Sequence, residues 1–290
     1  PHLAVSARPW PGTVAVWDAP GDAGFVLNRL IEAPAAMGIT GGPLFAARPG
    51  VWDRGPALRV RMLRGALVSA DPAAVLAGAN ALAIGDGSSD NWEVLQFCEA
   101  VPMAPGEWEI RMRLRGQAGS DGIMPEVWPE GSLVVALDGA AVQIALDPAH
   151  RGLARHYRIG AAARGLDDPA AVTRIEAFAG IGLRPYAPAH LRVRRDQGGD
   201  DHVSWIRRTR IDGDSWQSEE VPLGEAEERY RLRILMGGGI LREVTLGQPG
   251  FVYPAAMRAA DGIAGLWRIE VAQISDRFGA GPFRGIDRAG

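Results

Sequence analysis

The stretch Glu107-Trp108-Glu109-Ile110-Arg111-Met112-Arg113-Leu114-Arg115 decides the fold class of this chain. Large apolar side chains occupy its even positions, and charged side chains occupy its odd positions. A period of two is typical of a β-strand with one buried face and one solvated face. The pattern therefore predicts that Arg111, Arg113 and Arg115 project together from a solvated face.

Further strands are predicted on both sides of this stretch. Residues 58–64 alternate in the same way, and residues 133–137 and 141–146 flank Asp138-Gly139, which predicts a β-hairpin with a tight turn. Many short strands separated by turn residues favour a sandwich or barrel over βαβ units. The sequence predicts a mainly β fold with tandem β-sandwich-like domains.

Helix signals are few. The clearest covers residues 72–79, where Asp71 is placed to cap the first turn and Pro72 occupies the first helical position. A single short helix among many strands does not change the predicted fold class.

Two prolines in Arg184-Pro185-Tyr186-Ala187-Pro188-Ala189 predict a short, stiff linker. Beyond it, the strand pattern restarts and continues for about a hundred residues, the size of one immunoglobulin-like sandwich. The predicted division has three parts. Residues 1–50 form a partial or connecting segment of an upstream domain, residues 51–184 form a β-sandwich-like domain, and residues 185–290 form the final sandwich.

Composition excludes several classes of protein. The net charge of −3 and the pI near 6.0 provide no bulk attraction to nucleic acid or to an anionic membrane. The only cysteine, Cys98, excludes an intrachain disulfide, and its apolar surroundings predict a buried, unreactive thiol. No run of 18 apolar residues occurs, so no transmembrane helix is predicted.

No residue pattern predicts catalysis. The nucleophile motif Gly-x-Ser-x-Gly is absent, and Gly279-Ala280-Gly281 lacks the third glycine of a dinucleotide site. The histidines have no cysteine partners at zinc-binding spacing, and adjacent carboxylates on a strand point to opposite faces. The chain is therefore predicted not to be an enzyme and to hold no metal or cofactor.

Five residues are the candidate contact residues. Arg111, Arg113 and Arg115 would bind acidic groups of a neighbouring subunit, since guanidinium groups pair strongly with carboxylates. Trp128 and Trp216 lie in turn-rich stretches, where an exposed ring would stack on a sugar. The alternatives stay open at this point: a solvated sheet face for the arginines, and core or interface packing for the tryptophans.

The last hundred residues resemble a fibronectin type III domain. The resemblance rests on Val203-x-Trp205, on Tyr230-x-Leu232-x-Ile234 and on Trp267-x-Ile269-x-Val271. In that fold Trp205 would fill the core between the two sheets, and Tyr230 would pack beside it. The fold alone does not assign a function, because such sandwiches serve as spacers, adhesion modules and binding domains.

A wider resemblance covers roughly residues 51–275, which are similar to the C-terminal region of the large baseplate protein of gene transfer agents, called megatron, and of related siphophage tail-tip proteins. Four motifs carry it: Val51-Trp52-Asp53-Arg54-Gly55, residues 75–85, residues 92–97, and Arg113-Leu114-Arg115-Gly116-Gln117-Ala118-Gly119-Ser120-Asp121. The last motif is the most specific of the four.

This resemblance implies a structural component of a phage-like tail baseplate. Such a protein is expected to form a homotrimer at the tail tip, to contact other baseplate and tail proteins and tail fibres, and to meet a cell-surface glycan. It would be located in the virion, after assembly in the bacterial cytoplasm and release. Glycosidase-like domains of the family lie upstream of the matched part, and no catalytic residue maps onto this chain.

Two other functions remain open on sequence grounds. One is a carbohydrate-binding or adhesion module that recognises a cell-surface glycan. The other is an accessory region of a cell-wall hydrolase. An exposed tryptophan in a shallow groove would favour the first, and hydrolytic activity of the chain would favour the second.

Overall fold

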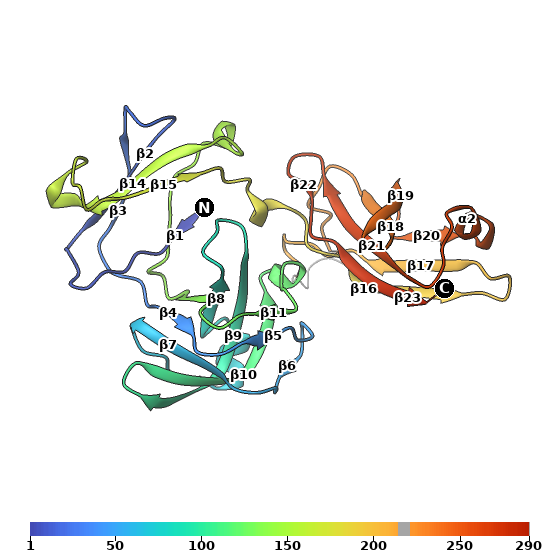
Figure 1. Ribbon diagram of the computed structural model, residues 1–290, viewed down its shortest axis with the longest axis horizontal. Coiled ribbons are helices and arrows are strands. Elements are labelled where there is room, and N and C mark those ends of the chain that lie inside the picture. Colours follow the sequence, from blue (N-terminus) through green and yellow to red (C-terminus); the bar gives the residue numbers. More distant parts are fainter. Residues whose placement is uncertain (214–220, 290) are drawn as a thin grey trace. The chain divides into compact units, whose positions relative to one another are not determined.

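The structure, a computed structural model, describes residues 1–213 and 221–289 (Figure 1). The chain divides into two compact units, Pro1–Gly180 and Ile181–Gly290. Strands predominate in the described part of both units, which confirms the predicted mainly β fold. Among the described residues, no helix is long and apolar enough to cross a membrane.

A closed β-barrel occupies the middle of the first unit. Its strands pair in the order β10-β7-β4-β12-β8-β9, and β9 pairs back to β10, so the barrel leaves no strand edge open. The short β6 pairs with Arg113 and Leu114 of β10, on the strand edge that β7 occupies at residues 107–110. The strands are β4 (Met37–Thr40), β6 (Trp52–Asp53), β7 (Leu58–Arg64), β8 (Ala81–Gly85), β9 (Trp92–Ala104), β10 (Glu107–Gln117) and β12 (Leu133–Ala136).

The barrel core follows from strand alternation. In β7, Leu58, Val60 and Met62 are buried, whereas Arg59 and Arg61 are exposed. Each fully buried aliphatic side chain of this size stabilises the fold by about 1.5–3 kcal/mol. The other large residues of this cluster are Leu44, Leu67, Leu82, Ile84, Leu95, Phe97, Ile110, Trp128 and Val134.

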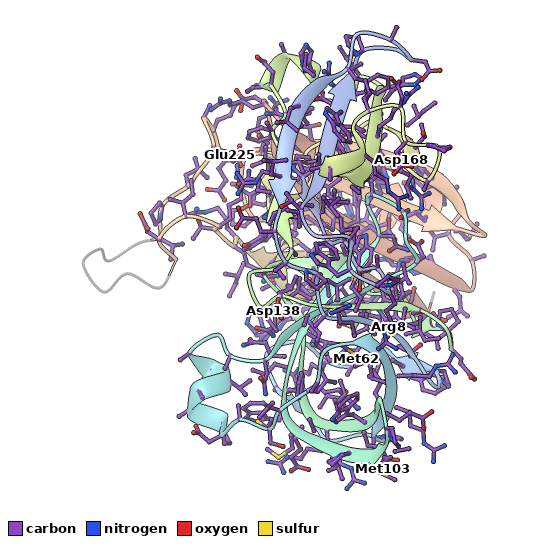
Figure 2. The ribbon with its side chains drawn as sticks, turned by 90° about the vertical axis from the view of Figure 1, so that its left-hand side faces the viewer. Arg8, Met62, Met103, Asp138, Asp168 and Glu225 are labelled. Atoms are coloured by element: carbon purple, nitrogen blue, oxygen red, sulfur yellow. The ribbon has the colours of Figure 1, made fainter. Side chains whose placement is uncertain are left out.

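In the hairpin of β9 and β10, the apolar side chains of β10 do not all pack into the same core. Ile110 packs in the barrel core, but Leu114 packs in a second cluster with Val75 and Cys98. Between them Met112 has a left-handed φ of 49°, which interrupts the extended backbone. Figure 2 shows the hairpin running to Met103 at one end of the barrel.

The arginines of β10 are consequently not on one solvated face. Arg111 is exposed, as the sequence predicted, but Arg113 and Arg115 are 2% and 0% exposed. The prediction of a solvated arginine face is corrected for these two residues, because the change of face at Met112 turns them into the protein.

The predicted short helix is confirmed. Helix α1 (Pro72–Leu76) begins after Asp71, whose side chain accepts a hydrogen bond of 2.9 Å from the backbone N–H of Ala74. Val75 is buried against Cys98, which is 3% exposed. Burial raises the pKa of the Cys98 thiol, consistent with the predicted unreactive side chain.

The predicted hairpin around Asp138-Gly139 is wrong. Both edges of β12 are occupied by β4 and β8 of the barrel, so no place remains for the following strand. Strand β13 (Val142–Gln143) instead pairs with β1 (His2–Leu3). The turn at Asp138, labelled in Figure 2, leads the chain out of the barrel.

A four-stranded antiparallel sheet completes the first unit. Its order is β15-β14-β2-β3, formed by β15 (Val172–Glu176), β14 (Arg155–Ala161), β2 (Val14–Ala19) and β3 (Val26–Ile31). Val14, Val16, Tyr157 and Ile144 form its core. A separate two-stranded sheet pairs β5 (Leu44–Phe45) with β11 (Val127–Trp128). In the sequence, β5 follows β4 and β11 precedes β12.

The barrel is thus inserted between the two halves of the four-stranded sheet. Residues 14–31 pair with residues 155–176, and the barrel strands lie between them in sequence. The backbone N–H of Ala136 donates to the carbonyl of Ala36 at 2.9 Å, so the barrel's entrance and exit are adjacent. The predicted domain boundary at residue 50 does not separate the sheets of this unit. Strands before residue 50 pair with strands after it, as β2 does with β14 and β4 with β7.

The second unit is a two-sheet sandwich. One sheet has the order β16-β17-β20, and the other has the order β19-β18-β21, with β22 and β23 also pairing with β21. The strands are β16 (Ala189–Arg195), β17 (Asp201–Ile206), β18 (Tyr230–Met236), β19 (Gly239–Leu246), β20 (Gly250–Tyr253), β21 (Leu266–Ser275), β22 (Gly279–Ala280) and β23 (Arg284–Ala289). This is a fibronectin type III-like arrangement.

The aromatic core of the sandwich agrees with the resemblance. Trp205 of β17 and Tyr230 of β18 come from different sheets, and their rings meet edge to face with centroids 5.1 Å apart. Tyr253 and Trp267 make a second contact at 5.7 Å. Helix α2 (Ala255–Ala260) follows β20, and single 3₁₀ turns occur in the chain at Ser120–Gly122, Pro148–His150, Ala162–Arg164 and Ile181–Leu183.

Candidate functional site

Four charged side chains form a buried cluster in the first unit. Asp53 comes from β6, Glu93 from β9, and Arg113 and Arg115 from β10. The side chains of Arg115 and Glu93 are 0% exposed, that of Arg113 is 2% exposed and that of Asp53 is 10% exposed. Buried charges are costly unless they are paired, so this cluster is the leading candidate site.

Glu93 is fully engaged by hydrogen-bond donors. Arg115 donates from Nε to Oε1 at 2.7 Å and from Nη2 to Oε2 at 2.8 Å, a bidentate pair. The indole N–H of Trp128 donates to Oε2 at 2.7 Å, and the backbone N–H of Gly116 donates to Oε1 at 3.1 Å. Arg115 also donates from Nη1 to the carbonyl of Phe45 at 2.7 Å, which links the barrel to β5.

Asp53 holds the second arginine. Arg113 donates from Nε to Oδ2 of Asp53 at 2.9 Å, and its Nη1 donates to the carbonyl of Pro56 at 2.8 Å. The backbone N–H of Gly55 donates to Oδ1 of Asp53 at 2.9 Å. Nη1 of Arg115 lies 3.7 Å from Oδ2 of Asp53 and joins the two pairs into one network.

This cluster is built to hold strands together. Two positive charges face two negative charges, and both carboxylates accept several charge-assisted hydrogen bonds. No carboxylate is left free to act as a base, and neither arginine points toward solvent. The arrangement fixes β5, β6, β9, β10 and β11 relative to one another, and removing one partner would leave a buried charge.

The rest of the Arg113–Asp121 motif covers the end of β10 and the tight turn that follows it. Gly116 has φ of 60°, and a Cβ atom there would lie 2.6 Å from Cα of Asp121. The Ser120 hydroxyl donates to the carbonyl of Gln117 at 2.7 Å and accepts from the backbone N–H of Val94 at 2.8 Å. Glycine is required at position 116 both for its φ and for this close approach.

The sequence analysis missed Asp53 and Glu93 as members of the cluster. Both stand inside motifs that carry the wider resemblance, Val51-Trp52-Asp53-Arg54-Gly55 and Trp92-Glu93-Val94-Leu95-Gln96-Phe97. Two isolated acids in apolar strands, together with two arginines in a third, were the available signal for a buried ion network.

The other candidate contact residues have different positions. Arg111 is exposed, with 52% of its side chain accessible, and pairs with Glu109 at 2.9 Å. Trp128 is 2% exposed and donates to Glu93, so the expectation that its ring would stack on a sugar is corrected. Trp216 lies outside the residues that the structure describes.

The second unit holds two smaller ion networks. Asp201, which is fully buried, accepts from Arg195 at 3.0 and 3.1 Å and from Arg258 at 2.6 Å. Asp261 accepts from Arg242 and from the Tyr253 hydroxyl, each at 2.7 Å. The Arg242 guanidinium lowers the pKa of Asp261, so this carboxylate stays charged and bound. Both networks join α2, or the residue that ends it, to strands of the sandwich.

Two small depressions on the described surface are candidate ligand sites. One of about 220 Å³ is lined by His190, Arg192, Ser204, Trp205 and Ile206. Another of about 260 Å³ lies beside Arg158, Asp167 and Asp168. Both are below the ~300–1,000 Å³ of typical small-molecule pockets. In residues 1–213 and 221–289, no three His, Cys, Asp or Glu side chains are grouped to hold a metal ion.

Comparison with known families gives one match. Residues 35–135 match the family described as Rcc01698-like, C-terminal. The matched segment begins just before β4 and ends within β12, so it covers the barrel and the buried charge cluster. No curated protein matches the chain.

Solved structures with fibronectin type III domains are among the similar ones. The chicken CNTN1 FN1–FN3 domains are 14% identical over 87% of this chain and 64% of theirs, with a TM-score of 0.26. A two-domain fibronectin type III segment from chicken tenascin is 10% identical over 87% of this chain and 99% of its own, also at 0.26. Domains d3–d4 of the rat CD45 extracellular region are 12% identical over 41% of this chain and 55% of theirs, at 0.28. At these TM-scores the likeness carries no argument about function.

Proposed function

We propose that this chain is a structural component of a phage-like tail baseplate of the gene transfer agent type. One observation carries the proposal: the residues of its most specific motif are used for internal packing. Arg113 and Arg115 bind Asp53 and Glu93, and Gly116 allows the backbone to approach Asp121. The motif that marks the resemblance therefore maintains a rigid barrel.

The family match supports the same proposal. It covers the barrel, and the resemblance of the sequence to baseplate proteins includes the motifs that supply all four members of the charge cluster. In this proposal the barrel is an assembly module, and the fibronectin type III-like unit is a spacer or contact domain. Location in the virion tail tip, a trimeric state and contact with tail fibres are parts of the proposal.

A non-enzymatic role fits the charge cluster. Its carboxylates are bound by arginine, tryptophan and backbone donors, and such groups are poor general bases. The carbohydrate-binding alternative loses the support of Trp128, because that ring is buried. The proposal thus assigns binding and support, and no reaction, to this chain.

Immunogold electron microscopy tests the proposal. Antibody raised against the chain is applied to purified particles and to lysates of the producing cells, and a strain that lacks the gene is the control. Gold at the end of the tail is the expected result. Gold on the cell envelope, with none on particles, would overturn the baseplate role and leave the glycan-binding module as the leading function.

A further inference from the structure

The outer face of the four-stranded sheet carries a row of side chains that crosses three strands. Trp17 of β2 lies directly opposite Arg158 of β14, and Arg158 lies directly opposite Thr173 of β15. Directly opposite residues of antiparallel strands project from the same face. Val16 and Tyr157, the sequence neighbours of this row, are in the core, so the row lies on the other face of the sheet. With strands about 4.8 Å apart, the row spans about 10 Å.

The loop of residues 162–171, which joins β14 to β15, borders this row. Together they form the depression of about 260 Å³, whose lining includes Arg158 and Thr173 of the row and Asp167 and Asp168 of the loop. Figure 2 shows Asp168 in this loop, beside the strands of the sheet. The depression therefore extends the row of side chains past the outermost strand.

Two charged side chains of the depression are held in place by the protein. Arg158 donates from Nη2 to Oδ1 of Asp22 at 3.0 Å, and its guanidinium lies 4.5 Å from the centre of the Phe25 ring. The Asp168 side chain is 6% exposed and accepts a hydrogen bond of 3.0 Å from the backbone N–H of Ala170. Both groups are thus positioned before any ligand arrives, which lowers the entropy cost of binding.

Other polar groups of the depression are free. Among the residues that the structure describes, the Asp167 carboxylate, the Thr173 hydroxyl and Nη1 of Arg158 have no hydrogen-bond partner. They place an acceptor, a hydroxyl and a donor around one hollow, and the half-buried ring of Trp17 ends the row. This mixture suits a ligand with several hydroxyl groups, because each hydroxyl both donates and accepts.

The charges around the depression disfavour an anionic ligand. Three carboxylates, those of Asp22, Asp167 and Asp168, face two guanidinium groups, those of Arg158 and Arg164. Both guanidinium groups already lie near carboxylates, at 3.0 Å and 3.7 Å. A phosphate or an acidic sugar would therefore meet uncompensated negative charge, and a neutral ligand would not.

We propose that this face binds a neutral oligosaccharide. The apolar face of a sugar ring stacks on Trp17, and its hydroxyls accept from Arg158 and donate to Asp167. The depression is shallow, so most of a longer glycan stays in solvent and a single site binds weakly. Three such sites in the proposed trimer would hold a polysaccharide more firmly than one, by multivalency.

An immobilised array of neutral and acidic oligosaccharides tests the ligand class with the whole chain. The expected result is retention of neutral oligosaccharides and weaker retention of acidic ones of similar size. In NMR titration with the best retained neutral oligosaccharide, the indole N–H signal of Trp17 should shift. The signal of Trp128 should not, because that indole is buried and bonded to Glu93. Retention of no oligosaccharide, or a preference for acidic ones, would overturn the proposal.

Two substitutions at exposed positions test the site itself. Asp167→Ala should weaken binding of the same oligosaccharide about tenfold and Thr173→Val about fivefold, since each removes one hydrogen bond to a sugar hydroxyl. Asp90→Ala and Thr245→Val are the matched controls, because both residues are exposed and lie outside the depression. Wild-type affinity in both site variants would contradict the assignment.

The inference goes beyond the proposed baseplate function and does not rest on it. Oligosaccharide binding is measured on the purified chain, whereas immunogold labelling locates the chain on particles or cells. Failure of either proposal would therefore leave the other standing.

Discussion

The tripeptide Arg-Leu-Arg occurs in a strand of each unit, with opposite outcomes. In β10, Arg113-Leu114-Arg115 has both arginines buried, at 2% and 0% exposed. In β18, Arg231-Leu232-Arg233 keeps 37% and 26% of the arginine side chains accessible, and both approach Glu243 on the neighbouring strand. The central leucine is buried in both, at 7% and 0% exposed.

The difference shows what strand alternation does and does not determine. Alternation fixes that the arginines lie on the face opposite the leucine. Whether that face meets solvent depends on what the rest of the chain places over it. In β18 the arginines stay partly accessible, with the Phe283 ring beside Arg233, but in β10 strands β6 and β9 bring Asp53 and Glu93 against the arginines. The same charge pattern therefore makes a solvated face in one unit and a structural centre in the other.

The largest expected effect is in the buried pair. Arg115→Met leaves Glu93 as an uncompensated buried carboxylate and should destabilise the first unit by about 3–5 kcal/mol. Urea unfolding, with hydrogen exchange of the β9 and β10 amides to identify the barrel transition, measures this change. The double variant Arg115→Met/Glu93→Gln removes the unpaired charge and should be more stable than Arg115→Met alone. Additive losses in the double variant would show that the two side chains do not act as a pair.

The turn that follows the buried arginines should give an intermediate effect. Gly116→Ala places a Cβ 2.6 Å from Cα of Asp121 in a backbone with φ of 60°, and should cost about 2–3 kcal/mol. Gly131→Ala is the control, because its φ is 84° but no atom lies within 4 Å of the added Cβ. Its cost should be only about 1 kcal/mol, from the backbone conformation alone. Equal costs in thermal unfolding would mean that the close approach to Asp121 is unimportant.

The smallest expected effect is in the solvated strand. Arg233 donates to Glu243 at 2.7 Å and lies 4.2 Å from the centre of the Phe283 ring, but it remains partly accessible. Arg233→Met should therefore change the stability of the second unit by less than about 1 kcal/mol. The change should shrink in roughly 0.5–1 M salt, because salt screens the attraction between accessible charges. A loss comparable to that of Arg115→Met would mean that exposure is not what separates the two tripeptides.

Much of the fold could be predicted from local patterns. The alternation at residues 58–64, the cap at Asp71 and the pairing of Trp205 with Tyr230 all depend on neighbouring residues or on a strong resemblance, and the structure confirms them. The hairpin at Asp138-Gly139 failed because its turn signal is local, whereas the occupancy of β12 by β4 and β8 is set by strands far away in the sequence.

The site was harder to predict for the same reason. Burial of Arg113 and Arg115 depends on the left-handed backbone at Met112, and methionine does not predict such a conformation. It also depends on carboxylates that lie 60 and 22 positions away in the sequence. Trp128 was singled out because its surroundings are rich in turns, but its indole N–H is used by Glu93. Long-range partners of this kind are not visible in a periodic pattern.

The insertion of the barrel between the two halves of the four-stranded sheet has a consequence for the order of folding. Strands β2 and β3 leave the ribosome first, yet their partners β14 and β15 follow only after the whole barrel has been made. The hydrogen bond between Ala136 and Ala36 shows that a folded barrel brings its two ends together. Once the barrel has folded, the segment between the two halves of the sheet is no longer a long flexible loop. The entropy cost of bringing the halves together is then that of a short connection. Barrel formation should therefore precede completion of the sheet during synthesis. Loss of the Glu93–Arg115 pair should then impair folding of the entire first unit and not of the barrel alone.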